Sequence, residues 1–390
     1  MISLADRTET FGRGRILYLT FGTFPSATAH SVNTIKMCEA MAKSGYKVIL
    51  VADARKKEKD IFEFYRIKYP FRIKRAKLLK IRFLGRILFL MKAYFFSKKI
   101  APDGLYTRDI FSSFLAKISR LPFIYEIHEI SDTSLRKIIF KSILKSKDLK
   151  GVVFISEKLK ETLISDMGNL FENIKHVVAH DGVDLEDFDF EHSQAELRKN
   201  LDLPENAFIA GYTGSLFEGR GLDIILKLGS TLKDLTFVLV GGEGKYLKAL
   251  IRKVRDLQLD NITVKGFVPH KMIPYYLSAS DILLMPYQTE VLHRQKKHDT
   301  ALYMSPLKMF EYMAAGKPIV ASSIPVLEEV LQNKVNALLV EPDDIDEWIE
   351  STRQLKEEKE MASQIGKQAK EDVKIYSWDK RIKKIFSNIY

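Results

Sequence analysis

The sequence predicts an α/β protein with two doubly wound, Rossmann-like domains, each built on a parallel sheet. Short apolar runs rich in β-branched residues alternate with longer segments of helical periodicity, which is the pattern of consecutive βαβ units. The chain is 390 residues long, which is enough for two domains with separate cores. With 46% hydrophobic and 29% charged residues, its composition is that of a globular protein.

The first half of the chain opens with a βαβ unit. A buried strand is predicted at 15–20, a loop at 21–29, a helix at 30–43 and a second strand at 47–51. In such a unit the loop after the first strand lies at the carboxyl edge of the sheet, where these folds bind ligands. Later strands are predicted at 104–107, 123–127, 152–156 and 176–179, and a helix is predicted to begin at Glu157.

A polar segment, 186–203, is predicted to link this first domain, at 1–185, to a second domain at 204–372. In the second domain, strands are predicted at 207–213, 236–240, 262–265 and 281–285, with helices at 221–233 and 272–279. Residues 373–390 form the C-terminal segment, which ends in a basic amphipathic helix. Residues 1–14 are polar, and we expect a frayed extension without a cleavable signal.

The net charge of +12 is concentrated in one interval, 64–102, which contains no acidic residue. There Lys and Arg alternate with aliphatic and aromatic side chains, as in segments that lie on anionic membranes. The same pattern could instead bind nucleic acid, or be the solvated basic face of a core helix. We favour a membrane surface or a lipid-linked acceptor, and we do not expect nucleic acid to be a partner.

Other features narrow the class of protein. The single cysteine, Cys38, lies in an apolar helical run and excludes a disulfide within the chain, which suits a reducing cytosol. No apolar run approaches the roughly 18 residues of a membrane-spanning helix, so none is expected. No His, Cys or Asp cluster has metal-ligand spacing, so we expect neither a metal nor another cofactor.

The most informative stretch is SPLKMFEYMAAGKPIVAS at 305–322. Ser305 is predicted to cap a short helix and Pro306 to occupy its first position. Gly316 is predicted to end the helix in the left-handed conformation, before a buried strand at 318–321. Leu307 and the other apolar residues of this helix are assigned to the core.

The start of this predicted helix suits an anion. The free N–H groups of Leu307 and Lys308 favour negative charge at the helix tip. Lys308 and Glu311 lie three residues apart on another face of the helix. The helix would thus offer an anion site at its tip, a cation beside that site and a carboxylate one turn further along. A nucleoside diphosphate fits this order, because its phosphates are followed by the ribose hydroxyls. The alternative is an ordinary amphipathic helix with a surface Lys–Glu pair.

This stretch resembles the signature segment of glycosyltransferase family 4, which comprises retaining enzymes of the GT-B fold. The resemblance implies two facing Rossmann-like domains with an interdomain cleft, and a C-terminal helix that returns to the first domain. It also implies a nucleotide-diphosphate sugar donor whose ribose hydroxyls bind Glu311. Relatives usually carry an earlier glutamate near the donor sugar, where this chain has Tyr303. The replacement argues against an obligatory nucleophile at this position.

A second stretch, GSLFEGRG at 214–221, follows the first strand of the second domain. Gly214 allows close approach of the backbone to a ligand, and Arg220 lies at a helix start where it could meet phosphate. A plain βα turn is the alternative. The resemblance implies two cations that clamp the diphosphate. Arg220 matches the second cation, whereas Ser215 stands where the first would be, so we expect Lys308 to supply the missing charge.

The remaining candidates come from the resemblance and from strand ends. His128 closes a strand, and the resemblance implies that it contacts the donor sugar; a structural histidine is the alternative. Gly22 and His30 are expected to help position the donor and the acceptor. The turn at Phe267 and Val268 is expected to recognise the nucleotide base. Arg108 and Asp109 are expected to contact the acceptor.

We therefore expect a retaining glycosyltransferase that moves a sugar from a UDP- or GDP-type donor to a hydroxyl of a glycan. The catalytic candidates are His128, Arg220 and Lys308, in a same-face mechanism where the leaving phosphate accepts the acceptor proton. The acceptor is expected to be lipid-linked, in lipopolysaccharide or capsule assembly, with the enzyme peripheral on the inner face of the cell membrane. Alternatives are a nucleotide-sugar epimerase and a basic nucleic-acid-binding protein.

Overall fold

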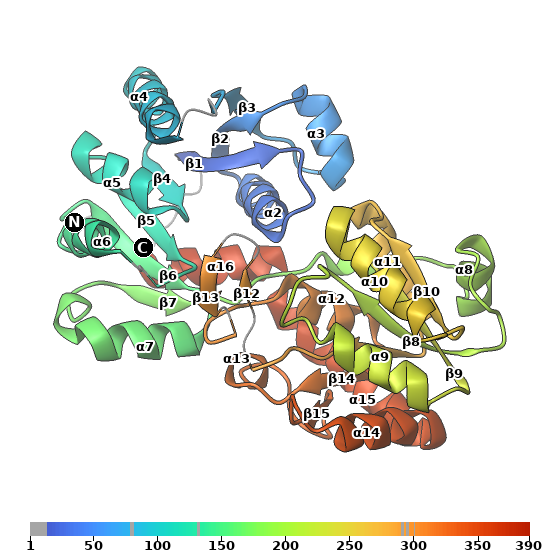
Figure 1. Cartoon of the computed structure of the whole chain (residues 1–390). Coiled ribbons are helices and arrows are strands. Elements are labelled where there is room, and N and C mark those ends of the chain that lie inside the picture. Colours follow the sequence, from blue (N-terminus) through green and yellow to red (C-terminus); the bar gives the residue numbers. More distant parts are fainter. Residues whose placement is uncertain (1–13, 79–81, 131–132, 290–291, 294–295, 300) are drawn as a thin grey trace. The chain divides into compact units, whose positions relative to one another are not determined.

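The computed structural model describes residues 14–78, 82–130, 133–289, 292–293, 296–299 and 301–390 (Figure 1). The expected N-terminal extension lies almost wholly outside these residues. The chain forms two compact units: unit 1 is Met1–Asp181 together with Trp378–Tyr390, and unit 2 is Gly182–Ser377. Each unit is an α/β sandwich with a parallel sheet, as predicted.

Unit 1 contains a sheet of seven parallel strands in the order β3-β2-β1-β4-β5-β6-β7. The strands are β1 (Arg15–Phe24), β2 (Lys47–Ala54), β3 (Arg72–Arg75), β4 (Gly104–Thr107), β5 (Phe123–Ile127), β6 (Leu149–Phe154) and β7 (His176–Val178). The strand order reverses between β1 and β4, which places the ligand-binding edge of this unit beside their carboxyl ends. β1 is longer than predicted because Thr23 and Phe24 rejoin β2 after an irregularity in register.

The helices of unit 1 are α2 (Ala29–Lys43), α3 (Glu58–Tyr65), α4 (Arg82–Ile100), α5 (Ile110–Ser119), α6 (Ser134–Leu144), α7 (Glu157–Met167) and α16 (Trp378–Ile389), with the 3₁₀ turn η1 (Gly168–Leu170). Side chains cap several of them. Thr28 accepts a hydrogen bond from the N–H of Ser31 at the start of α2, and Ser156 accepts one from Leu159 at the start of α7. Such caps satisfy N–H groups that have no partner within the helix.

Unit 2 contains a sheet of six parallel strands in the order β10-β9-β8-β11-β14-β15, which is the strand order of a Rossmann domain. These strands are β8 (Phe208–Thr213), β9 (Leu235–Val240), β10 (Ile262–Gly266), β11 (Ile282–Met285), β14 (Ile319–Ser322) and β15 (Leu338–Val340). A separate antiparallel pair consists of β12 (Leu292–His293) and β13 (Lys296–Asp299). The order reverses between β8 and β11.

The main helices of unit 2 are α8 (Gln194–Asn200), α9 (Leu222–Thr231), α10 (Gly244–Asp256), α11 (Ile273–Ala279), α12 (Leu307–Ala315), α13 (Pro325–Glu328), α14 (Ile345–Glu357) and α15 (Lys359–Asp372). The 3₁₀ turns are η2 (Leu185–Phe188), η3 (His270–Met272) and η4 (Val373–Tyr376). The cores of both faces are apolar, and Phe237, Phe310 and Trp348 are among the largest fully buried side chains.

The segment expected to be a linker, 186–203, contains α8 and is packed into unit 2. Leu197 and Leu201 are buried there, although most neighbouring residues are polar. The buried Arg198 donates hydrogen bonds to the carbonyl of Ala279 at 3.0 Å and pairs with Asp281 at 2.7 Å. These polar residues therefore belong to the fold, and the chain passes between the units at Asp181–Gly182 instead.

The C-terminal helix, α16, belongs to unit 1, whereas residues 373–376 form η4 in unit 2. Ile382, Ile385 and Ile389 of α16 are buried. Gly151 on β6 makes room for this helix, since a Cβ there would lie 2.8 Å from Cγ1 of Ile389. α16 therefore completes the core of unit 1.

Candidate active site

The candidate site of unit 2 lies at the carboxyl ends of β8 and β11, where the strand order reverses. The Gly214 loop follows β8, and Tyr287 follows β11. Gly214 has φ of 140° and Gly221 has φ of 71°, conformations that favour glycine. A Cβ at Gly221 would lie 1.6 Å from the carbonyl oxygen of Pro286, so this close approach of two loops requires glycine.

Helix α12 begins at the same edge. Pro306 is its N-cap residue, and the side chain of Pro306 makes no capping hydrogen bond. The prediction that Ser305 caps the helix was wrong, because the helix begins one residue later than expected. Gly316, with φ of 66°, ends it as predicted. The side chain of Pro306 cannot accept hydrogen bonds from the first N–H groups of α12, and such a helix start suits an anion.

Lys308 is buried at the start of α12. Its Nζ lies 4.4 Å from the ring centroids of both Tyr212 and Tyr287, so the ammonium is held between two aromatic faces. Burial, reinforced by the charge of Arg220, lowers the pKa of Lys308 well below its ordinary value. A Cβ at Gly214 would lie 3.7 Å from Nζ, which places the ammonium against the glycine loop.

Arg220 approaches the same tyrosine. Its Cζ lies 5.1 Å from the centroid of Tyr287, and its buried Nε has no hydrogen-bond partner among the described residues. Within the described part of the chain, no carboxylate forms an ion pair with Arg220 or Lys308. Two cations without carboxylate partners therefore meet beside the open start of α12.

Glu311 lies one turn further along α12, and its Oε1 is 2.8 Å from Nε2 of His270 in η3. The sequence analysis did not single out His270. The available signal was its place directly after the predicted base-recognition turn, where Gly266 has φ of 69°. In that turn Phe267 is exposed, whereas Val268 packs against the apolar cluster of α8 and α11.

The other candidates of unit 2 occupy less exposed positions. Tyr303 is buried and Leu307 is half-buried. The carbonyl of Ser215 accepts a hydrogen bond of 2.8 Å from the hydroxyl of Tyr212, the ring that supports Lys308. Ser215 therefore touches the cation site through its backbone.

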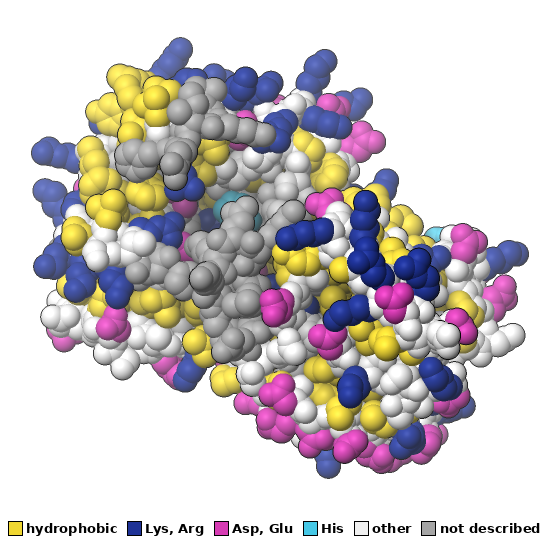
Figure 2. Space-filling view, in the orientation of Figure 1, with side chains coloured by type: hydrophobic (Ala, Val, Ile, Leu, Met, Phe, Trp, Pro, Cys, Tyr) yellow, Lys and Arg dark blue, Asp and Glu magenta, His cyan; other side chains and the backbone are white. Residues whose placement is uncertain are grey.

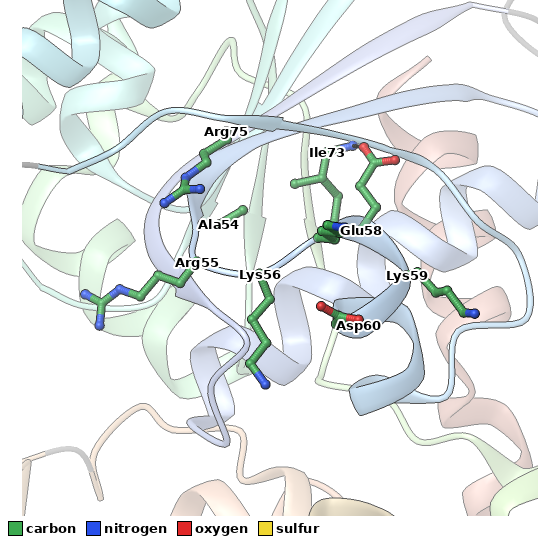
Figure 3. A pocket seen from close by; sticks show the side chains of 9 residues that line it. Ala54, Arg55, Lys56, Glu58, Lys59, Asp60, Ile73 and Arg75 are labelled. Carbon is green, nitrogen blue, oxygen red and sulfur yellow. Dashed lines mark hydrogen bonds between the residues drawn. The ribbon is translucent and has the colours of Figure 1, made fainter.

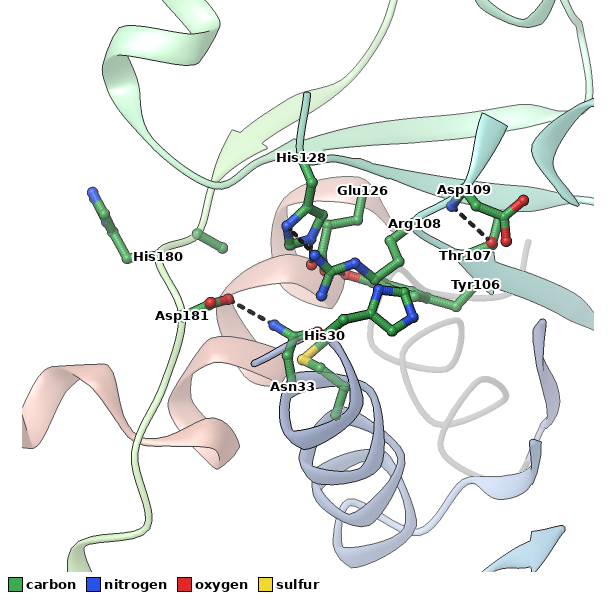
Figure 4. Close-up of polar contacts among 12 residues, drawn as sticks. His30, Asn33, Tyr106, Thr107, Arg108, Asp109, Glu126, His128, His180 and Asp181 are labelled. Atoms are coloured by element: carbon green, nitrogen blue, oxygen red, sulfur yellow. Dashed lines mark hydrogen bonds and ion pairs between the residues drawn. The ribbon is translucent and has the colours of Figure 1, made fainter. Parts of the chain in front are cut away.

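The candidates of unit 1 form a second polar cluster, at the carboxyl ends of β1, β4 and β5 (Figure 4). Nη2 of Arg108 lies 2.6 Å from Nδ1 of His128, and Nε2 of His128 pairs with the fully buried Glu126. Across the cluster, the amide of Asn33 donates a hydrogen bond of 2.6 Å to Asp181. Burial, together with the charge of Arg108, lowers the pKa of His128 to about 4, so its ring is neutral at pH 7.

His30 and Gly22 are neighbours in this cluster. Nε2 of His30 lies 2.9 Å from the hydroxyl of Thr20, and a Cβ at Gly22 would lie 3.0 Å from the same nitrogen. Burial lowers the pKa of His30 well below its ordinary value. Asp109 accepts a hydrogen bond of 2.8 Å from the N–H of Ser112 and caps α5.

Family models match both units in succession. The model for Glycosyltransferase Family 4 matches residues 31–187, and the model for Glycosyl transferases group 1 matches residues 193–372. The chain belongs to the family 4 glycosyltransferases.

Curated relatives are distant. The D-inositol 3-phosphate glycosyltransferase of Salinispora tropica is 24% identical over 224 residues, which are 53% of this chain and 44% of that protein. The O-antigen chain mannosyltransferase RfbU of Salmonella typhimurium is 27% identical over 221 residues, 56% of this chain and 54% of that protein. The chain thus matches about half the length of these relatives.

Solved structures show the fold over nearly the whole chain. The Anabaena protein Alr3699/HepE, in complex with UDP and glucose, has a TM-score of 0.75 at 18% identity and covers 96% of this chain and 99% of its own. WaaG, a glycosyltransferase involved in lipopolysaccharide biosynthesis, has a TM-score of 0.67 at 12% identity over 95% of this chain and 99% of its own. The predicted GT-B fold is confirmed.

The site predicted from this family is thus divided between two clusters, one in each unit. Arg220, Lys308 and Glu311 meet in unit 2, and His30, Arg108 and His128 meet in unit 1. No group of three or more His, Cys, Asp or Glu side chains that could hold a metal ion occurs among the described residues.

A surface pocket of about 810 Å³ lies elsewhere in unit 1, between the end of β2, the first turn of α3 and β3 (Figure 3). Its basic lining residues include Arg55, Lys56, Lys59 and Arg75, which accompany Glu58 and Asp60. None of the predicted donor, acceptor or catalytic residues lines it, although Ile73 and Arg75 belong to the basic interval 64–102.

Proposed function

We propose that this protein is a retaining glycosyltransferase that uses a nucleotide-diphosphate sugar. One observation carries the proposal: Lys308 and Arg220, two cations without carboxylate partners in the described residues, meet beside the start of α12, where a proline is the N-cap. A diphosphate would supply the missing negative charge. Glu311 lies one turn further in, at the place where ribose hydroxyls would follow the phosphates.

This arrangement suits the chemistry of transfer. As the bond from the sugar to the phosphate breaks, negative charge grows on the departing diphosphate. Fixed cations and N–H dipoles stabilise that charge without reorganising during the reaction, which is commonly the largest single catalytic contribution. The proposed same-face mechanism uses a phosphate oxygen to accept the proton of the acceptor hydroxyl, so it needs neither the glutamate replaced by Tyr303 nor a metal ion.

We propose that the acceptor is a glycan, carried by a lipid, in the assembly of a cell-surface polysaccharide. The names of two relatives support this class: the mannosyltransferase of O-antigen chains, and a teichuronic acid biosynthesis glycosyltransferase of Bacillus subtilis that is 30% identical over 117 residues. Unit 1 would provide the acceptor side through Arg108 and its neighbours.

A surface of unit 1 supports peripheral attachment to the inner face of the cell membrane. Helices α4, α5 and α6 contain no acidic residue and expose large apolar side chains, which Figure 2 shows gathered over these helices with basic side chains around them. This membrane face consists of Leu84, Ile87, Met91, Phe95, Ile118, Leu135 and Ile138. Phe95 is 65% exposed and Ile138 is 65% exposed. Anionic lipid complements the charge of the face, and its apolar side chains suit shallow insertion.

Among the described residues, no helix has the length and hydrophobicity needed to cross a membrane.

The function can be tested by screening UDP-, GDP- and ADP-sugars for thermal stabilisation and then for transfer to lipid-linked glycans. We expect stabilisation by one donor class and a product with the anomeric configuration of the donor. Conversion of the free donor without an acceptor would favour an epimerase instead. Tight, salt-dependent binding of DNA or RNA without affinity for any nucleotide sugar would contradict the proposal.

A further inference from the structure

The fully buried carboxylate of Glu126 connects the C-terminal helix to His128 in unit 1. Its Oε2 accepts hydrogen bonds from the hydroxyl of Tyr106 and from Nη1 of Arg381, the latter at 3.0 Å. Its Oε1 pairs with Nε2 of His128. Burial raises the pKa of Glu126, but the charge of Arg381 and the hydrogen bond from His128 outweigh burial and hold this pKa well below its ordinary value. Glu126 is therefore ionised inside the domain.

Arg381 is an unexpected residue at the centre of a helix interface. It is 3% exposed, its Nε donates to the carbonyl of His180 at 2.7 Å, and its Nη2 donates to the carbonyl of Ala179 at 3.1 Å. Removing a guanidinium from water is unfavourable, and apolar residues already anchor α16. Anchoring of α16 in unit 1 therefore does not by itself explain why Arg381 is buried.

The proton positions along this chain of contacts follow from chemistry. An arginine only donates, so Nδ1 of His128 accepts from Arg108. A carboxylate only accepts, so Nε2 of His128 carries the proton and donates to Glu126. The neutral ring is thus fixed as the Nε2–H tautomer, and both of its nitrogens are occupied.

We infer that Arg381 and Glu126 are positioning residues that act through the tautomer of His128 to hold the guanidinium of Arg108. Arg108 is half-buried and has no carboxylate partner within the described residues, so its remaining N–H groups are available to an oxygen of the acceptor. The assignment of that oxygen to the sugar acceptor rests on the proposed function. The directions of the hydrogen bonds from Arg381 to Arg108 do not depend on it.

Replacement of Glu126 by Gln should reverse the direction of the hydrogen bond between this residue and His128. Arg381 and Tyr106 both donate to Oε2, so the amide oxygen of Gln is expected to take that position. Its NH₂ group would then face Nε2 of His128, which must accept. The ring proton would move to Nδ1, where it opposes the N–H of Arg108. Glu126→Gln should therefore release Arg108 while preserving the volume of the side chain.

The tautomer can be measured without any substrate, by NMR of protein with ¹⁵N-labelled histidine, with the His128 signal assigned from a His128→Asn variant. We expect the Nε2–H form in the wild-type protein at pH 7 and the Nδ1–H form in Glu126→Gln. Arg381→Lys should keep the wild-type tautomer because it keeps the charge. Lys383→Gln, which replaces an exposed cation of the same helix, is the matched control and should change nothing.

Kinetics of the same variants measure the consequence. In Glu126→Gln the acceptor KM should rise about two- to tenfold, as expected for one lost hydrogen bond, while the donor KM stays within twofold. A wild-type His128 that is protonated or Nδ1–H at pH 7 would overturn the inference. So would a Glu126→Gln variant with a lower melting temperature but unchanged tautomer and acceptor KM. If the wild-type protein transfers no sugar, the proposed function fails. The NMR measurement of the His128 tautomer would still test the predicted hydrogen-bond directions.

Discussion

Nε2 of His270 lies 2.8 Å from Oε1 of Glu311 and orients the carboxylate that we assign to the ribose of the donor. The two residues come from different segments, η3 and α12. A carboxylate held by one neighbour loses less conformational freedom when it binds a ligand. This contact determines how the two residues should respond to substitution.

Glu311→Ala should weaken binding of the nucleotide by about ten- to a hundredfold, because loss of a charged hydrogen-bond partner costs roughly 1.5–3 kcal/mol. His270→Ala should have a smaller effect, since His270 acts through the carboxylate. In the double variant the two effects should not add. Calorimetric titration with nucleotide measures all three, and an unchanged affinity in Glu311→Ala would remove this residue from the donor site.

Arg220→Gln and Lys308→Met should each lower kcat more than they raise the donor KM. Both cations face charge that grows toward the transition state, so their contribution is largest there. Lys248→Gln, which replaces an exposed cation of unit 2, is the control. A variant with near-normal turnover would show that its cation does not meet the diphosphate.

Binding of the diphosphate should depend on pH through Lys308. Burial and Arg220 lower the pKa of its ammonium in the free protein, and a bound diphosphate would raise it again. Between the lowered pKa and the ordinary lysine value, binding should take up a proton, and affinity should fall as pH rises. In the same window the unfolded chain binds more protons than the folded one, so this residue makes the stability of the free protein rise with pH.

Calorimetry in buffers of different ionisation enthalpy measures the proton uptake directly. The Lys308→Met variant should lose it. If the wild-type protein and the Lys308→Met variant take up the same number of protons, the proton binds to another group.

Vesicles test the membrane face. Wild-type protein should float with anionic vesicles, and binding should decrease with salt without disappearing, because apolar insertion remains. Phe95→Ser with Ile138→Ser should reduce flotation, whereas Ile251→Ser with Leu257→Ser, exposed apolar residues of unit 2, should not. Charge reversal at Lys74, Arg75 and Lys77 tests the basic contribution; Lys80, which belongs to the same predicted interval, lies outside the described residues. Wild-type protein that stays in solution with strongly anionic vesicles at low salt would contradict the attachment.

Metal removal is a separate test. The proposed site uses Arg220, Lys308 and N–H dipoles to meet the diphosphate, so transfer should persist after dialysis against a chelator. Loss of activity that only a divalent ion restores would overturn the metal-free mechanism.

Local signals predicted the regular parts of the fold. The strands at 104–107 and 123–127 and the helix that begins at Glu157 have the predicted bounds, because short buried runs and a capping serine determine them locally. β3 and α3 were not predicted, since their short sequences carry many charges. Their positions depend on pairing with β2, which no local pattern reveals.

The geometry of the site depended on contacts between distant segments. The burial of Lys308 requires rings from two other segments, Tyr212 in β8 and Tyr287 after β11. Arg381 meets Glu126 across 255 residues, and the sequence predicted its helix only as a basic amphipathic segment. Residue types at helix starts and strand ends could be read from the sequence, whereas partners of buried charges could not.

Unit 1 is built from two stretches of the chain, Met1–Asp181 and Trp378–Tyr390, and this affects how the protein folds during synthesis. Residues up to Asp181 leave the ribosome before the whole of unit 2 has been made, and α16 follows only afterwards. At about 5–20 residues per second, unit 1 would wait roughly 10–40 s for this helix. Until then the apolar groove beside Gly151 is uncovered and Glu126 lacks its arginine. The nascent domain would be exposed to chaperones and proteases throughout that delay, and a truncation after Ser377 would make this state permanent.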